Sequence, residues 1–474
     1  MKLILIILAI LPPIFIIIIL LCKYKKLDKL ITSVLFATIV HELLLITFPV
    51  IYSISNNFEH ESNLNIDASI SDLLKVMFGE VLFVFAFTII FLLGLNLKKN
   101  FVFNDKKENV LIFGNRTESR LFVFLITIGA ITFFLQLSTM GFSISNPILS
   151  QIIDWSSGIF FSYTPIVASA ILVTKRNIFK YYPNLAKLSI ICLLSVIILG
   201  ILTAARGRIM WVASLVIIMG FIYNQKKIIY FSVISLLFFL PFFAFLGNFK
   251  NLAATSIISG GKSLDLIKII IDERSSVTEL SQSQSNGSFF YSFAERAQGP
   301  RNSIVLYNSY DNGNGPNASI YLGSIFFPIP RLLWPTKPIP GSVNEDESNS
   351  AVFKVMDKGH DLPYMGPILA SAHAYWEGGY MAVLLYGFVT GGLWVSIFLL
   401  CSKLPYNLSM IIVLSFSAAL LIDGFITIFS PLYAYILIFW KWVFPTLFLY
   451  VFLKLFKTAK NIQNPLSVIN INGK

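Results

Sequence analysis

The chain has 474 residues, of which 56% are hydrophobic and only 13% are charged, and its mean hydropathy is +0.76. A soluble domain carries about 25% charged residues, so this composition excludes a soluble globular protein. The net charge of +12 does not indicate a nucleic-acid partner, because the excess is mostly lysine beside apolar segments, as in cytoplasmic anchors. The three cysteines are scattered without metal-ligand spacing, so neither a disulfide framework nor a zinc site is expected.

Apolar stretches of about 20 residues, the length that crosses a hydrocarbon core, recur along the chain. Each should be an α-helix, because lipid offers no other partner for backbone polar groups. The sequence therefore predicts an all-α, polytopic membrane protein with about eleven spans. The predicted spans are residues 2–22, 31–53, 72–96, 121–143, 154–174, 187–203, 209–225, 228–247, 377–400, 407–429 and 432–454.

These spans divide the chain into four parts. Residues 1–247 hold eight predicted helices, 248–376 form one large hydrophilic loop with short helices, 377–456 hold three helices, and 457–474 form a tail. No small-residue cleavage site follows the first span, which is expected to be retained rather than removed as a signal peptide.

Lysine and arginine follow the first, third, fifth, seventh, ninth and last spans, whereas the linkers at 54–71 and 144–153 contain neither. By the positive-inside rule, this alternation predicts an N-terminus outside and a cytoplasmic C-terminus. Lys2 argues mildly for the opposite orientation of the N-terminus.

Two arginines in the run TAARGRIMW at 203–211 depart from this alternation. The predicted topology puts Arg206 and Arg208 on the outer side, at the turn between the sixth and seventh spans. They could anchor helix ends at lipid headgroups. The interpretation favoured here is recognition of a phosphorylated ligand, because the guanidinium fork matches phosphate oxygens.

The segment PIPRLLWPTKP at 328–338, in the predicted outer loop, contains four prolines that hold the chain extended. Arg331, Trp334 and Lys337 would project from this stiff frame. They could bind phosphate and a sugar ring, or the segment could be an interfacial loop. Arg296 and Arg301 occupy a helix-compatible stretch of the same loop, where ion pairing and substrate contact are equally compatible with the sequence.

The run MGPILASAHAYWEGGY at 365–380 leads into the ninth predicted span. His373 and Glu377 are four residues apart and would share one helix face, and histidine suits proton transfer near neutral pH. The alternative is an interfacial histidine and a glutamate at a helix end.

Four charged residues lie inside predicted spans, where such groups usually pair or line a wet cavity. They are Glu42, Glu80, Asp423 and Lys441, and the last two are predicted to form an ion pair between the final two helices.

Several common catalytic motifs are absent from the sequence. There is no phosphate-binding G-x-x-x-x-G-K-[ST] loop, no G-x-G-x-x-G after a strand, and no H-E-x-x-H. An enzyme with this sequence would therefore use a substrate that is already activated. No metal ion or cofactor is expected.

Four segments between residues 200 and 400 resemble one family, the bacterial oligosaccharide repeat-unit polymerases, also called O-antigen or Wzy-type polymerases. The segments are ARGRIMW, YSFAERAQG, YLGSIFFPIPRLLWPTKP and GPILASAHAYWEGGYMAVLLYGFVTGG. Such proteins are similar in architecture to multi-span C-type glycosyltransferases. The run AYWEGGY matches more loosely than the other segments, which leaves the role of Glu377 open.

The resemblance implies an enzyme at the outer face of the bacterial cytoplasmic membrane. It would transfer a growing glycan from undecaprenyl diphosphate onto a new lipid-linked repeat unit, making O-antigen, capsule or exopolysaccharide without a nucleotide sugar. Its partners would be the two lipid-linked glycans, membrane lipid, a chain-length regulator and a flippase, with no nucleic acid.

In this interpretation Arg206, Arg208 and Arg331 stabilise the diphosphate leaving group, and His373 or a loop carboxylate accepts the proton of the acceptor hydroxyl. Substrate binding falls to Arg296, Arg301, Trp334, Lys337 and Glu377. The alternatives are a ligase of finished glycan, a transporter or flippase of lipid-linked glycan, and a structural partner of a synthesis complex.

Overall fold

The computed structural model of the chain is helical throughout the residues that it describes, and those residues contain no β-strand. The described residues are 1–23, 27–55, 69–96, 131, 164–174, 183–202, 206–230, 234, 299–313, 319–329, 333–334, 368–404, 406–417, 428–445, 447–448 and 451.

The helices are α1 (Lys2–Lys23), α2 (Lys29–Glu42), the π-helical turn η2 (Leu43–Thr47), α3 (Phe48–Ser55), α4 (Ile70–Asn96), α7 (Thr164–Thr174), α9 (Pro183–Leu202), α10 (Arg206–Ile222), α15 (Gly299–Asp311), α16 (Ser319–Ile325), α18 (Ala370–Cys401), α19 (Tyr406–Ser417), α20 (Leu432–Ile438) and the π-helical turn η5 (Phe439–Val443). Of these, α1, α4 and α18 are long and apolar enough to cross a membrane. The prediction of an all-α membrane protein is therefore confirmed.

The first three predicted spans correspond to described helices. The spans 2–22 and 72–96 correspond to α1 and α4, and 31–53 corresponds to the continuous run α2–η2–α3. The ninth span was predicted to begin at 377, but α18 already begins at Ala370. Apart from Ile131, the span 121–143 lies outside the described residues. Most of 228–247 and the side chains of Asp423 and Lys441 lie outside them as well.

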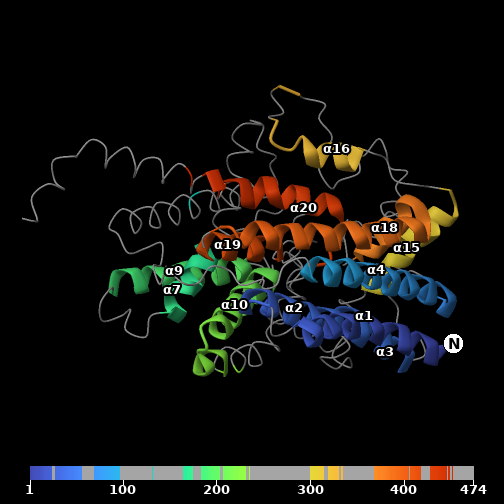
Figure 1. The fold of residues 1–474 in the computed structure, drawn as a ribbon, viewed down its shortest axis with the longest axis horizontal. Helices are drawn as coiled ribbons and strands as arrows, with labels where there is room; N and C mark the ends of the chain where they lie inside the picture. The colour runs from blue at the N-terminus through green and yellow to red at the C-terminus, as the bar shows by residue number, and fades with distance from the viewer. Residues whose placement is uncertain are drawn as a thin grey trace, which may run out of the picture.

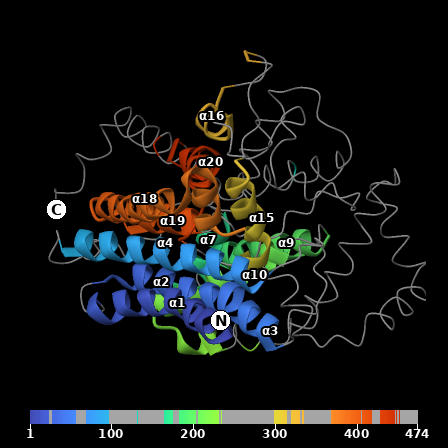
Figure 2. The ribbon, with the colours of Figure 1, turned by 90° about the vertical axis from the view of Figure 1, so that its right-hand side faces the viewer.

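The long helices form a bundle along the longest axis of the molecule (Figure 1). In both ribbon views, α1 and α2 lie on one side of α4 and α18 lies on the other, followed by α20 and then α16 (Figure 2). The central pair is α4 and α18, which pack on each other more extensively than any other two described elements.

Glycines allow this central pair to approach closely. If Gly387 carried a Cβ atom, that atom would lie 2.5 Å from the carbonyl oxygen of Phe83, and a Cβ atom on Gly391 would lie 2.8 Å from that of Phe87. The two glycines are four residues apart, the small-xxx-small spacing that lets membrane helices pack backbone to backbone. Gly387 faces Phe83 and Gly391 faces Phe87, so residue numbers increase in the same direction along both helices. The two helices therefore run parallel.

Two prolines inside α1 remove backbone donors, and a neighbouring helix replaces one of them. In an α-helix the N–H of residue 13 would donate to the carbonyl of Ala9, but Pro13 has no N–H. The hydroxyl of Thr47, in η2, donates to that carbonyl instead, at 2.7 Å. Such replacement is needed where lipid excludes water.

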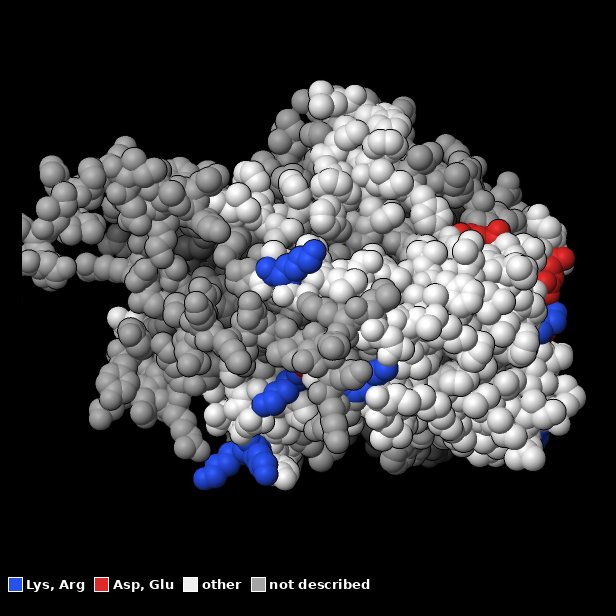
Figure 3. Space-filling view, in the orientation of Figure 1, with Lys and Arg blue, Asp and Glu red and all other residues white. Residues whose placement is uncertain are grey.

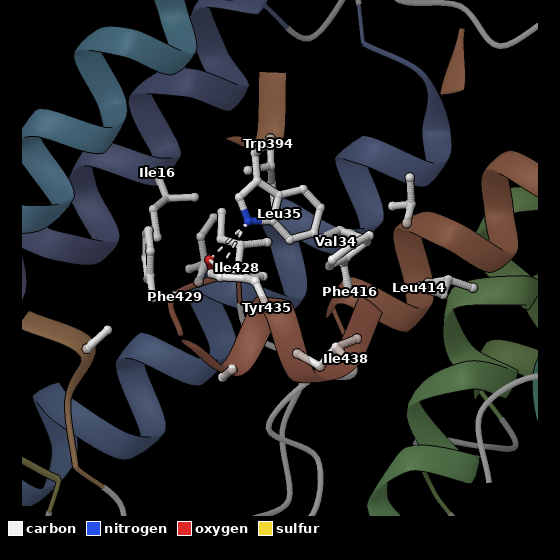
Figure 4. Packing of buried hydrophobic residues seen from close by; sticks show 14 of the residues in the cluster. Ile16, Val34, Leu35, Trp394, Leu414, Phe416, Ile428, Phe429, Tyr435 and Ile438 are labelled. Atoms are coloured by element: carbon white, nitrogen blue, oxygen red, sulfur yellow. Dashed lines mark hydrogen bonds between the residues drawn. The ribbon is translucent and has the colours of Figure 1, made fainter. Parts of the chain in front are cut away.

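A second break leaves a backbone carbonyl that is paired by the side chain of Trp394, in α18 (Figure 4). The chain at Ile428 is not helical, and its carbonyl is buried just before α20 begins. Trp394 Nε1 donates to this carbonyl at 3.1 Å, and the Tyr435 hydroxyl donates to it as well. The buried carbonyl of Ile428 is therefore paired inside the bundle.

Several helix ends meet at one end of the bundle, here called the lysine end. Lys23, at the end of α1, donates to the side chain of Asn96 at the end of α4. Lys29, at the start of α2, donates to the carbonyl of Ile222 at the end of α10, at 3.4 Å. Figure 3 shows Lys and Arg around the middle of one face and again at its right edge, where most Asp and Glu lie.

We expect Gly387→Ala to lower the free energy of unfolding by about 1–3 kcal/mol, because the new methyl group would meet the backbone of α4. The measurement is thermal unfolding of the purified protein in detergent. Gly392→Ala is the matched control, since its Cβ atom would lie 4.0 Å from the nearest atom, on Ile90. Equal stability of the two variants would contradict close packing of α4 and α18.

Candidate functional site

The chain of α18 reverses direction at Gly378 and Gly379. Neither residue is helical, and Gly379 has φ 64° and ψ −158°, a conformation that only glycine adopts readily. The reversal separates a short arm, residues 370–377, from a long arm, residues 380–401.

Contacts with α4 show the direction of each arm. In the short arm, Ser371 donates to Glu80. At the reversal, the Tyr380 hydroxyl donates to the carbonyl of Lys75 at 3.3 Å. The long arm then packs Gly387 against Phe83. The short arm therefore runs toward the beginning of α4, and the long arm runs back alongside it.

The reversal brings Glu377 of the short arm next to Tyr386 of the long arm. In a straight helix, residues nine apart are separated by about 13.5 Å along the axis, too far for a side-chain hydrogen bond. Here the Tyr386 hydroxyl donates to Glu377 Oε2. The Tyr321 hydroxyl, from α16, donates to Glu377 Oε1 and lies 2.6 Å from the Tyr386 hydroxyl.

These three side chains form a phenol–carboxylate cluster. Burial, the hydrogen bond to Glu377 and the charge of that carboxylate together raise the pKa of Tyr321 above its ordinary value. Tyr321 therefore stays protonated at neutral pH and acts as a donor. A carboxylate offers about four acceptor positions, so two phenols leave Glu377 able to accept from a further hydroxyl group.

Aromatic rings extend from this cluster. The ring of Tyr433, in α20, is 6.4 Å from that of Tyr321 and 5.7 Å from that of His373. Just after α16 in the chain, the ring of Phe326 is 5.4 Å from that of Trp334. Apolar ring faces beside a hydrogen-bonding carboxylate are the groups that a sugar ring can contact.

A second set of contacts fixes the short arm against the start of α4. Lys75 Nζ lies 3.0 Å from Asp311 Oδ2, at the end of α15. The Tyr375 hydroxyl donates to Asp311 Oδ1 at 2.9 Å, and its ring stacks on that of Tyr307 at 3.9 Å. The end of α15 therefore positions the residues directly before the reversal.

The structure joins two of the segments that the sequence singled out. Tyr321 is the first residue of YLGSIFFPIPRLLWPTKP, and Glu377 belongs to the run that precedes the ninth predicted span. Their hydrogen bond brings these segments together although they are 56 residues apart. His373 and Glu377 lie in the same helical arm, as their spacing predicts.

The structure describes only some of the arginine and lysine residues that were predicted to belong to the site. Arg206 and Arg208 lie in the first turn of α10, and their side chains are outside what the structure describes. Arg296, Arg331 and Lys337 lie outside the described residues, whereas Arg301 is half-buried in the first turn of α15. The last residue of α10, Ile222, lies beside Lys29 at the lysine end. The first turn of α10, which carries Arg206 and Arg208, is therefore at the opposite end of this helix.

Sequence reasoning missed three tyrosines of the site. Tyrosines of the outer loop were expected to position sugars, but neither Tyr321 nor Tyr386 was named as a site residue, and Tyr433 follows the Ser430–Pro431 turn. The nine-residue spacing between Glu377 and Tyr386 has no meaning for a continuous helix. The adjacent glycines were the available signal that the helix breaks between them.

In the part of the chain that the structure describes, no group of three or more His, Cys, Asp or Glu side chains could hold a metal ion. What the described site can do chemically is accept a hydrogen bond at Glu377 and contact a ring with its aromatic side chains. Comparisons with protein-family models, curated proteins and solved structures give no match to this chain.

We expect Gly379→Ala to lower the free energy of unfolding by about 1–3 kcal/mol, because alanine is strained at this positive φ. The new methyl group would also lie 3.2 Å from the Tyr310 hydroxyl. Thermal unfolding of the two purified variants would compare it with Gly378→Ala, whose φ of −173° any residue adopts. If Gly379→Ala were no less stable than Gly378→Ala, the described reversal would be wrong.

Proposed function

We propose that this protein polymerises oligosaccharide repeat units linked to undecaprenyl diphosphate into a surface polysaccharide. The observation that carries the proposal is the hydrogen bond between Tyr321 and Glu377. It unites two of the segments that resemble the repeat-unit polymerases, and it does so in a cluster suited to sugar contact.

The proposal includes a topology with eleven spans in the bacterial cytoplasmic membrane, the N-terminus outside and the C-terminus inside. The loop at 248–376 would then lie on the outer face. The lysine end of the bundle supports this arrangement. Lys23 and Lys29 lie at that end, where α4 finishes, whereas the reversal of α18 lies at the opposite end, near the start of α4. The helices α15 and α16 would belong to this loop.

In the proposed reaction, a hydroxyl oxygen of the acceptor repeat unit attacks the anomeric carbon of the donor glycan. A new glycosidic bond forms as the bond from that carbon to diphosphate breaks, and undecaprenyl diphosphate leaves. Arg206, Arg208 and Arg331 would stabilise the negative charge that grows on the leaving group, with help from Arg296 and Lys337.

The acceptor proton requires a base near the sugar. His373 would accept it, and Glu377, held by its two phenols, would orient the sugar by accepting a hydrogen bond from another hydroxyl. Trp334 and Tyr433 would contact the sugar rings. Arg301, in the first turn of α15, would bind substrate.

We expect Arg206→Ala and Arg331→Ala each to reduce polymer formation by about 100- to 1,000-fold, because each removes a donor aimed at developing charge. Gel electrophoresis of surface glycan should then show single repeat units on their final carrier. Lys227→Ala, a cation beyond the other end of α10, should keep the normal ladder. Wild-type chain length in both arginine variants would refute the assigned roles.

The gel pattern also separates the proposal from its alternatives. Loss of a ligase leaves lipid-linked polymer that is not attached to its final carrier. Loss of a flippase leaves repeat units on the inner face of the membrane.

For the sugar site, we expect Glu377→Gln to reduce polymer formation by about 10- to 100-fold, the loss of one charged hydrogen bond. Tyr321→Phe should lower it less, because Tyr386 still holds the carboxylate. Tyr230→Phe, whose tyrosine is 67% exposed, is the matched control. The measurement is the rate of polymer formation in membranes, and an unchanged rate for Glu377→Gln would remove Glu377 from the site.

A further inference from the structure

Two carboxylates lie inside the helix bundle, away from the phenol–carboxylate cluster. Glu42 of α2 is 1% exposed and Glu80 of α4 is 2% exposed. The charge on Glu42 acts on Glu80, and α15 packs against both α4 and η2, the turn that directly follows Glu42. Within the described part of the chain, neither forms an ion pair with lysine or arginine. The proposed glycosyl transfer has no use for either residue.

Polar side chains from three elements surround the pair. Ser371, in the short arm of α18, donates to Glu80 Oε2. His41 Nδ1, in α2, lies 3.4 Å from Glu42 Oε1. The hydroxyl of Tyr307, in α15, reaches Gly79 beside Glu80, where a Cβ atom on that glycine would lie only 1.8 Å from it. His41 and Tyr307 are the titratable groups that the described elements present to the carboxylates.

Within the part of the chain that the structure describes, two oxygen atoms at this place are buried without a hydrogen bond of ordinary geometry, although the side chain of Ser371 lies beside one of them, the Tyr307 hydroxyl. Among the described residues, neither Glu42 Oε2 nor the Tyr307 hydroxyl forms a hydrogen bond of ordinary geometry. A buried polar atom left unpaired costs about 1–3 kcal/mol. The two atoms come from different helices, and Tyr307 is not part of the acidic pair, so each is a separate indication that a ligand binds here.

The charge of that ligand follows from electrostatics. Moving a carboxylate out of water costs several kcal/mol, and two adjacent carboxylates in a medium of low dielectric also repel each other. A cation removes both costs. The ligand atoms are mostly oxygens, which suit a hard cation rather than a transition metal.

We propose that Glu42 and Glu80 form a binding site for one monovalent cation, either a proton or an alkali-metal ion such as Na⁺, in the core of the bundle. The bound cation links α2 to α4. Through Ser371 it also reaches the short arm of α18. The site does not depend on the proposed polymerase function.

The test uses the full chain purified in lipid nanodiscs. Thermal unfolding is followed while NaCl replaces N-methylglucamine chloride at constant ionic strength, and separately while the pH is varied without sodium. If Na⁺ is the ligand, the unfolding temperature rises by about 1–2 °C for each tenfold increase in Na⁺ above half-saturation. If a proton is the ligand, the stabilisation is present at low pH and is lost as the pH rises.

The variant Glu42→Gln/Glu80→Gln should lose whichever response the natural protein shows. Asp72→Asn, which removes a carboxylate from the solvated start of α4, should keep it. Should the double variant fail to fold, infrared spectroscopy of the natural protein replaces it. A protonated carboxyl band is then expected without sodium, and its loss on adding Na⁺ identifies the alkali ion.

Identical responses of the natural protein and the double variant to sodium and to pH would overturn the proposal. In the infrared measurement, the absence of any protonated carboxyl band, together with no effect of Na⁺, would overturn it as well.

Discussion

The reversal of the chain at Gly378 and Gly379 is the constraint on which the candidate site depends. It places Glu377 beside Tyr386, and it holds Ser371 at Glu80, deeper along α4 than Lys75. A continuous helix would separate these groups by several turns. Because Gly379 has a conformation that other residues adopt only with strain, two adjacent glycines determine where the site can form.

Lipid as a solvent explains why breaks in the helices near the site are paired with side chains. Every break in a helix leaves a backbone carbonyl that water cannot reach, so a side chain must pair with it. Thr47 pairs with the carbonyl left free by Pro13, and Trp394 pairs with that of Ile428. These pairings connect α1 to η2 and α18 to the segment before α20, which holds the central α4–α18 pair in place.

Hydropathy predicted much of the described fold, because crossing a membrane sets the length and the apolar character of each helix. The bounds of α1 and α4 agree with the predicted spans to within two residues. Hydropathy carries no information on the reversal in α18, since glycine also occurs where helices pack closely, as Gly387 does. The candidate site was predicted in part. His373 and Glu377 were selected by their chemistry and spacing, whereas Tyr386 could be assigned to the site only from the reversal of the chain in the structure.

The most direct test of the central claim is the reaction itself in a minimal system. Purified protein in liposomes would receive repeat units linked to undecaprenyl diphosphate, with no nucleotide and no second protein. The account predicts a ladder of glycans of whole repeat units, with one undecaprenyl diphosphate released for each linkage formed. Repeat units that stay single in the presence of correctly folded protein would contradict it.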